Sequence, residues 1–182
     1  MSSFVRGDWM QTYTGRAFYP MDPDPIDIDP LDIAHALSML CRYNGHVDRF
    51  YSVAEHCILM SNAVPAKDAL WALLHDATEA YVGDMIRPLK RFMPEYRTVE
   101  DRLMEAIASR FGLTGTMPAS VKDADNRILL TERAALLSAP PAPWGFGLED
   151  LDPLPVFISG WAPEVVEPMY LDRLGELLGG VR

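Results

Sequence analysis

The amino-acid sequence predicts an all-α fold, a compact single-domain bundle of about six helices with a small β element near the N-terminus. Apolar residues recur at three- and four-residue spacing in several stretches, as they do in helices that pack one face on a core. The 182 residues are 49% hydrophobic and 23% charged, which is typical of one globular domain with a substantial core. We therefore treat residues 1–182 as a single domain.

The first thirty residues are expected to form an extended arm or hairpin. Residues 9–19 mix aromatic residues and threonines around a glycine, a pattern typical of a short hairpin. The next stretch, PMDPDPIDIDP, has too many prolines for a helix and alternates isoleucine with aspartate, so it predicts a loop with a short edge strand. Asp29 and Pro30 then suit an N-cap and a first helical position, and they predict a helix to about Leu40.

Residues 53–64 and 66–82 are predicted to form two successive helices separated by a proline. Ser52 and Glu55 form the S-x-x-E pattern of a capping box, so the first helix carries His56 in its first turn or just beyond. Leucines and alanines then repeat at helical spacing, and a glycine ends the second helix.

The rest of the chain predicts further helices and one long loop. Residues 85–93 form a short irregular or helical segment, and residues 98–111 form an amphipathic helix that a glycine ends. Residues 118–137 form a helix opened by a proline, and a last helix spans residues 163–178. Between these two, residues 139–163 are rich in proline and aromatics and predict a long ordered loop or a subunit contact.

An adjacent histidine and aspartate lie in the apolar helix predicted over residues 66–82. His75 and Glu79 share one face of this helix, and Asp76 lies roughly 100° round the same cylinder, so all three could line one pocket. A buried carboxylate beside an imidazole is costly unless its charge is compensated, and a bound cation is a common solution. The alternative is a core histidine–aspartate hydrogen bond that only orients two helices.

Four residues from three helices could form a metal site: His56, His75, Asp76 and Asp125. Two nitrogen and two carboxylate ligands suit one divalent ion, and the set accepts manganese, iron, cobalt, nickel, zinc or magnesium. Asp125 lies where the apolar residues of its helix face the core. Taken alone, Asp125 has the alternative of an exposed acid in a charged turn.

The order of these residues resembles that of the HD-domain metal-dependent phosphohydrolases, and most of all the small single-domain members of 5'-deoxynucleotidase type. The resemblance runs through the pattern H…HD…D and covers residues 42–130, about half the chain. Five short motifs carry it in matching order: VAEH at 53–56, HDATE at 75–79, VGD at 82–84, P-x-K at 88–90 and AD at 124–125. It implies an all-α fold of the HD-domain type.

The resemblance also implies roles for the residues that match its motifs. The metal ion would be held by His56, His75, Asp76 and Asp125, so that Asp76 serves both metal binding and catalysis. Glu79 would be the second catalytic residue, which orients the attacking water and moves its proton.

Five further residues are predicted to contact the substrate. Arg42 and Tyr43 resemble the pair that contacts phosphate and sugar or base, Lys90 resembles a phosphate contact, and Asp84 would hold a sugar hydroxyl. His46, beside the Asn-Gly turn, could also touch phosphate. The alternatives are a salt-bridged loop arginine, a core tyrosine, a solvated lysine and a structural histidine.

The function that the resemblance implies is hydrolysis of a nucleotide phosphate, in the first place by a 5'-deoxynucleotidase acting on deoxyribonucleoside 5'-monophosphates. One alternative enzyme is a deoxynucleoside triphosphate triphosphohydrolase or alarmone hydrolase with the same metal site. A different class is a non-catalytic sensor that only binds metal or nucleotide. Members of the family are often dimers or larger, so we expect a homodimer or higher homo-oligomer.

Composition and charge limit the kinds of ligand and partner that we expect. A net charge of −10 lowers the expectation of a nucleic-acid polymer and favours a small nucleotide. No apolar run approaches the roughly 20 residues that span a bilayer, and the N-terminus has no secretory pattern, so we expect a cytoplasmic protein without a membrane partner. Cys41 and Cys57 lack metal-ligand spacing and predict no disulfide. His35 is interpreted as an ordinary packing or surface histidine, because no acidic residue is spaced to join it.

Overall fold

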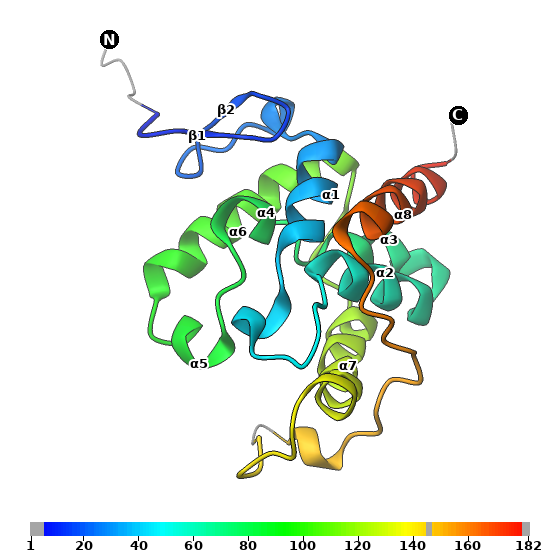
Figure 1. Ribbon diagram of the computed structural model, residues 1–182. Helices are drawn as coiled ribbons and strands as arrows, with labels where there is room; N and C mark the ends of the chain where they lie inside the picture. Colours follow the sequence, from blue (N-terminus) through cyan, green and yellow to red (C-terminus); the bar gives the residue numbers. More distant parts are fainter. Residues whose placement is uncertain (1–5, 145–146, 180–182) are drawn as a thin grey trace.

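The computed structural model describes residues 6–144 and 147–179, whose regular structure is helical apart from one N-terminal hairpin (Figure 1). The hairpin pairs two antiparallel strands, β1 (Met10–Gln11) and β2 (Ala17–Phe18). The longer helices are α1 (Pro30–Met39), α2 (Val53–Ala63), α6 (Pro94–Phe111), α7 (Ala119–Leu136) and α8 (Pro163–Leu177). Three short helices lie between them: α3 (Ala69–Leu74), α4 (Glu79–Val82) and α5 (Arg87–Lys90). The predicted all-α fold with a small N-terminal β element is confirmed.

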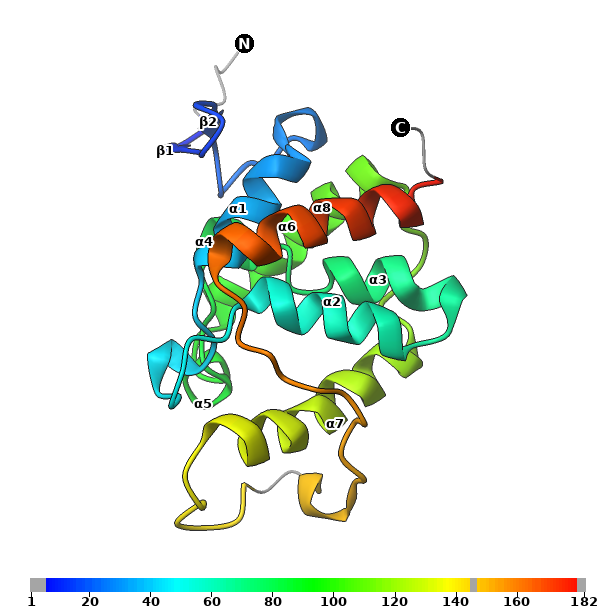
Figure 2. The same cartoon turned by 45° about the vertical axis from the view of Figure 1, so that its right-hand side comes forward.

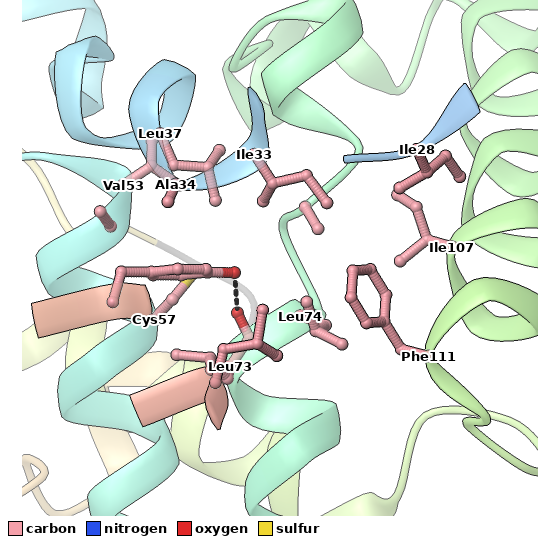
Figure 3. Packing of buried hydrophobic residues seen from close by; sticks show 14 of the residues in the cluster. Ile28, Ile33, Ala34, Leu37, Val53, Cys57, Leu73, Leu74, Ile107 and Phe111 are labelled. Carbon is pink, nitrogen blue, oxygen red and sulfur yellow. Dashed lines mark hydrogen bonds between the residues drawn. The ribbon is translucent and has the colours of Figure 1, made fainter. Parts of the chain in front are cut away.

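Helix α2 lies at the centre of the molecule. It packs against α1, α3, α7 and α8, and Figure 2 shows α2 and α3 side by side, with α8 on one side of them and α7 on the other. The main core joins α1, α2, α3, α6 and α8; Figure 3 shows Leu37, Val53, Leu73 and Ile107 converging in it. This packing fixes the helix that carries His56.

Side chains cap the helices where the sequence predicts. Asp29 accepts a hydrogen bond from the backbone N–H of Leu31 at the start of α1. Ser52 accepts one from the backbone N–H of Glu55 at the start of α2. The reciprocal half of the predicted capping box does not form, because the Glu55 carboxylate turns away from its own helix and binds the segment before α8.

The helix predicted over residues 66–82 is interrupted, and that prediction is wrong in its middle. Helix α3 ends at Leu74 and α4 begins at Glu79, and the residues between them form tight turns in which Glu79 N–H donates to the carbonyl of Asp76. The Nδ1 atom of His75 lies 2.8 Å from the Ala72 carbonyl, so a side-chain donor competes for an oxygen that an α-helix would use. The break therefore falls on the histidine–aspartate pair.

Two other predictions need correction. The edge strand expected in residues 20–30 is absent from this part of the structure, where a single turn of 3-10 helix, Pro25–Asp27, follows the Asp24 cap instead. His35 does have an acidic partner, because its Nδ1 lies 2.8 Å from Glu167 of α8, and its ring stacks on Tyr13. Both partners come from distant parts of the chain, where residue spacing gives no signal.

The predicted loop over residues 139–163 is irregular except for one short 3-10 turn, Leu148–Asp150. Parts of two predicted segments, residues 1–5 of the N-terminal arm and 145–146 of this loop, lie outside the described residues. Among the helices that the structure describes, none combines the length and the apolar character that crossing a membrane requires.

Candidate metal centre

The four predicted metal ligands converge at one point between α2, α3 and α7. The Nε2 atoms of His56 and His75 lie 3.2 Å apart, and Oδ2 of Asp76 lies 3.6 Å and 3.2 Å from them. Oδ1 of Asp125 lies 3.7 Å from the Nε2 atom of His56. His56, His75 and Asp125 each offer a ligand atom within 4.8 Å of the others, so this buried group could hold a metal ion.

Hydrogen bonds at the Nδ1 atoms set which nitrogen of each imidazole faces this point. Nδ1 of His75 donates to the Ala72 carbonyl, and Nδ1 of His56 lies 2.6 Å from Oε1 of the buried carboxylate Glu132. Both Nδ1 atoms therefore carry a ring proton, so that in the neutral rings both Nε2 atoms present lone pairs to the same space. This is the state in which an imidazole binds a metal ion.

The charges of the cluster are strongly coupled. Burial opposes the charge of Asp76, but His75, His56 and Arg42 outweigh it and hold the pKa of that carboxyl well below its ordinary value. Burial likewise opposes the charge of His75, but the Asp76 carboxylate outweighs it and raises the pKa of His75 well above its ordinary value. A positive charge at this point is thus strongly favoured, whether a proton or a metal ion supplies it.

A second trio of potential ligands, Cys57, His75 and Asp76, also lies within 4.8 Å. Burial raises the pKa of the Cys57 thiol, and the thiolate is the form that binds metal. The two groups of potential ligands overlap at His75.

Glu79 lies beside the cluster and is buried. Its Oε2 atom has no hydrogen-bond partner among the described residues. Burial, Asp76 and Asp84 all raise the pKa of Glu79 well above its ordinary value. A buried carboxyl oxygen without a partner is rare, and here it is positioned for a water or a ligand.

The cluster opens into a cavity of about 620 Å³ that also contains every predicted substrate residue. Its polar part includes Arg42, His46, Asp84 and Lys90 besides the acidic residues already described. Its apolar part includes the side chains of Tyr43, Met85, Ile86, Pro88, Leu129, Leu137, Trp144 and Leu148. Charged and aromatic side chains lining one cavity suit a ligand with an anionic and a ring-shaped part.

Contacts within the protein already engage several of these residues. Arg42 donates to Asp76 over 3.4 Å and to Glu132 over 3.3 Å, and Tyr43 donates its hydroxyl proton to Glu132. Lys90 forms a 2.7 Å ion pair with Glu100 of α6. The predicted phosphate contacts therefore line the cavity, but each also neutralises a carboxylate.

Two residues of the site were not identified from the sequence. Glu132 is fully buried and contacts His56, and Arg87 lines the cavity and forms a 2.7 Å ion pair with Asp125. Glu132 comes seven residues after Asp125, about two helical turns, so it lies on the same side of α7. That spacing was the available signal, whereas Arg87 lies in a run of exposed basic residues that gives none.

Comparison with known proteins places the chain in a family. No protein-family model matches it. It is 38% identical to the uncharacterized protein YfdR of Escherichia coli (strain K12) over 170 residues, which cover 93% of this chain and 95% of YfdR. It is also 38% identical to the uncharacterized protein RCAP_rcc00048 of Rhodobacter capsulatus over 176 residues, with 88% of each chain covered. Identity at this level along nearly the whole of both chains means that this protein belongs to the same family as YfdR.

Proposed function

We propose that the protein is a metal-dependent phosphohydrolase of the HD-domain type that releases phosphate from deoxyribonucleoside 5'-monophosphates. The order of its motifs resembles that of the small 5'-deoxynucleotidases. The cavity that joins the His/Asp cluster to basic and aromatic side chains supports the same activity.

The observation that carries the proposal is the 3.2 Å separation of the two Nε2 atoms. With both Nδ1 atoms committed as donors, the two Nε2 atoms can lie this close only with a positive charge near both, and a divalent cation can replace the proton that otherwise supplies it. At metal–nitrogen distances of about 2.1 Å, two neighbouring ligands are separated by roughly 3.0–3.4 Å. The separation therefore suits one divalent ion shared by His56 and His75, with Asp76 and Asp125 as its carboxylate ligands.

Such an ion, when bound, acidifies a water molecule and polarises a phosphate oxygen. The unpartnered Oε2 atom of Glu79, in its ionised form, would then accept the proton of the attacking water. Arg42 and Lys90 offset the charge that develops on the phosphoryl oxygens. Asp84, which also lines the cavity, would accept a hydrogen bond from a sugar hydroxyl.

The charges of the cavity favour a monophosphate over a triphosphate. Three basic side chains and a divalent ion face four carboxyl groups there, so the excess of positive charge is small: Arg42, Arg87 and Lys90 against Asp76, Glu79, Asp84 and Asp125. A phosphate monoester carries about two negative charges near neutral pH, which is closer to this small excess than the larger charge of a triphosphate. The ring of Tyr43 and the apolar wall leave room for a nucleoside.

The test is release of phosphate, pyrophosphate and triphosphate from ribo- and deoxyribonucleoside mono- and triphosphates and from an alarmone. Metal-stripped protein is resupplied with single divalent cations, and the Glu79→Gln variant is compared with Glu95→Gln, an exposed glutamate of α6. We expect free phosphate from deoxyribonucleoside monophosphates, lost in Glu79→Gln and kept in Glu95→Gln.

Other outcomes would contradict the proposal in distinguishable ways. Triphosphate or pyrophosphate released from a nucleoside triphosphate would make the protein a triphosphohydrolase. Turnover of the alarmone alone would make it an alarmone hydrolase. Bound metal with no turnover of any substrate would make the protein a sensor.

A further inference from the structure

Glu132 is a buried carboxylate that the proposed reaction does not use. It lies on α7, is fully excluded from solvent, and accepts four hydrogen bonds from side chains of two other parts of the chain. Burying one charge this completely is costly, and a glutamate that only filled space could be replaced by an apolar residue. Its contacts therefore need a reason.

One oxygen of Glu132 holds the metal ligand on α2. Its Oε1 atom lies 2.6 Å from Nδ1 of His56 and 2.9 Å from the hydroxyl of Tyr51. The bond fixes the ring orientation and keeps the proton on Nδ1, which leaves Nε2 free for a cation. Burial opposes its charge, but Arg42 and His56 outweigh it and lower the pKa of Glu132 to about 2, so it is ionised near neutral pH.

The other oxygen holds the loop between α1 and α2. Oε2 accepts from the hydroxyl of Tyr43 and, over 3.3 Å, from the guanidinium of Arg42. The backbone of this loop is strained, because Tyr43 and Asn44 have φ of 57° and 51°, in the left-handed region that costs a non-glycine residue about 1 kcal/mol or more. The contacts of Tyr43 and Arg42 with Glu132 counteract that cost and fix where both side chains lie in the cavity.

We propose that Glu132 is a positioning residue that couples the metal centre to the substrate loop, holding His56 through one oxygen and the Arg42–Gly45 loop through the other. The predicted effect of Glu132 on substrate binding rests on the proposed function, whereas its predicted effect on metal binding does not. The coupling means that one substitution at Glu132 weakens metal binding and substrate binding together, although Glu132 touches neither ligand.

The coupling can be measured with the Glu132→Gln variant, which keeps the shape of the side chain and removes its charge. Manganese binding to metal-stripped protein is followed by calorimetry, and the histidine tautomers by long-range ¹H–¹⁵N NMR. We expect Glu132→Gln to lose about ten- to hundredfold in manganese affinity and to shift His56 from the single Nδ1–H tautomer. Glu95→Gln is the matched control and should match the unsubstituted protein.

The Tyr43→Phe variant separates the contact of Glu132 with the Arg42–Gly45 loop from its contact with His56. It removes one contact to Oε2 and leaves the His56 bond, so manganese affinity should stay within about twofold, while KM for the nucleotide rises with little change in kcat. Glu132→Gln should lower manganese affinity and raise KM in the same protein.

Three results would overturn this inference. One is unchanged manganese affinity and an unchanged His56 tautomer in a folded Glu132→Gln variant. Another, which needs no variant, is an Nε2–H tautomer of His56 in the metal-free unsubstituted protein. A third is a Tyr43→Phe variant with the unsubstituted KM. If manganese binds and depends on Glu132 but no nucleotide is hydrolysed, the proposed function fails while the metal half of the coupling is supported.

Discussion

At the scale of single residues, the ring nitrogens of His56 and His75 decide what the site can bind. Each Nδ1 atom is committed to an oxygen, Glu132 in one case and the Ala72 carbonyl in the other. The partner is a backbone group for His75 and an ionisable side chain for His56. His56 is therefore the ligand whose orientation a single substitution elsewhere can release.

Removing a ligand should remove the metal. In His75→Ala one Nε2 atom is lost from a set of four ligands, and we expect bound metal to fall to less than a tenth of an equivalent after dialysis, measured by elemental mass spectrometry. His46→Gln is the matched control, because it changes an exposed histidine of the same cavity that lies outside the cluster. Full metal content in His75→Ala would contradict the assignment of the centre.

Acid should destabilise the metal-free protein partly through Glu132. Its pKa in the folded protein is about 2, against an ordinary value of 4.5. A lowered carboxyl pKa gives stability that is fully present above pH 4.5 and is lost as the pH falls towards 2. The loss corresponds to about 3 kcal/mol. The free energy of unfolding, measured with denaturant across this range, should depend less steeply on pH in Glu132→Gln than in the unsubstituted protein. Equal slopes would contradict the stabilisation of the Glu132 carboxylate by its charged partners.

The residues of the site differ in how readily the sequence reveals them. His56, His75 and Asp76 stand out because histidines and acids in apolar helices need compensation, whereas Asp125 stands out only in combination with them. Glu132 does not, since one glutamate among the arginines and threonines of an amphipathic helix has the composition of a solvated face. Only the fold, which places α2 against α7, shows that it is buried.

At the scale of elements, helix ends were predictable and helix interiors less so. The Ser52 and Asp29 caps act within three residues of themselves, so local sequence determines them. At the break over residues 75–78 the His75 side chain binds the Ala72 carbonyl, while the apolar spacing continues through it. The spacing of apolar residues indicates which face of a segment is buried. It does not indicate whether the backbone hydrogen bonds of the helix continue without a break.

The cap of α2 offers a test at this scale. Replacing Ser52 with alanine removes the acceptor for the Glu55 N–H at a fully buried helix start, and we expect a loss of about 1 kcal/mol in the free energy of unfolding. The exposed Ser109 of α6 serves as control, and Ser109→Ala should change stability by less than about 0.5 kcal/mol. Equal effects of the two substitutions would show that the cap contributes nothing.

At the scale of the whole molecule, the candidate metal centre joins helices that are far apart in sequence. Its ligands come from α2, from the break after α3 and from α7, so a bound ion links three parts of the fold that unfolding separates. An ion that binds only the folded state stabilises it by mass action. The predicted homo-oligomer stays a prediction.

Metal should therefore raise the thermal stability of the protein. At a free concentration one hundred times Kd the gain is about 2.7 kcal/mol, which for a chain of this size raises Tm by roughly 5–11 °C. The measurement is calorimetric melting with manganese and with a chelator, with His75→Ala as the variant that should not respond. An equal rise in that variant would place the stabilising ion elsewhere.

Glu55 connects the C-terminal part of the chain directly to α2, the helix that carries His56. Its buried carboxylate accepts the backbone N–H groups of Ser159, Gly160 and Trp161, just before α8, and its neighbour in α2 is His56. A mechanical pull applied beyond α8 would therefore reach the first turn of α2 through three hydrogen bonds. A force applied at the C-terminal side should therefore reach the candidate metal centre early. A force applied through the N-terminal hairpin would first act on α1.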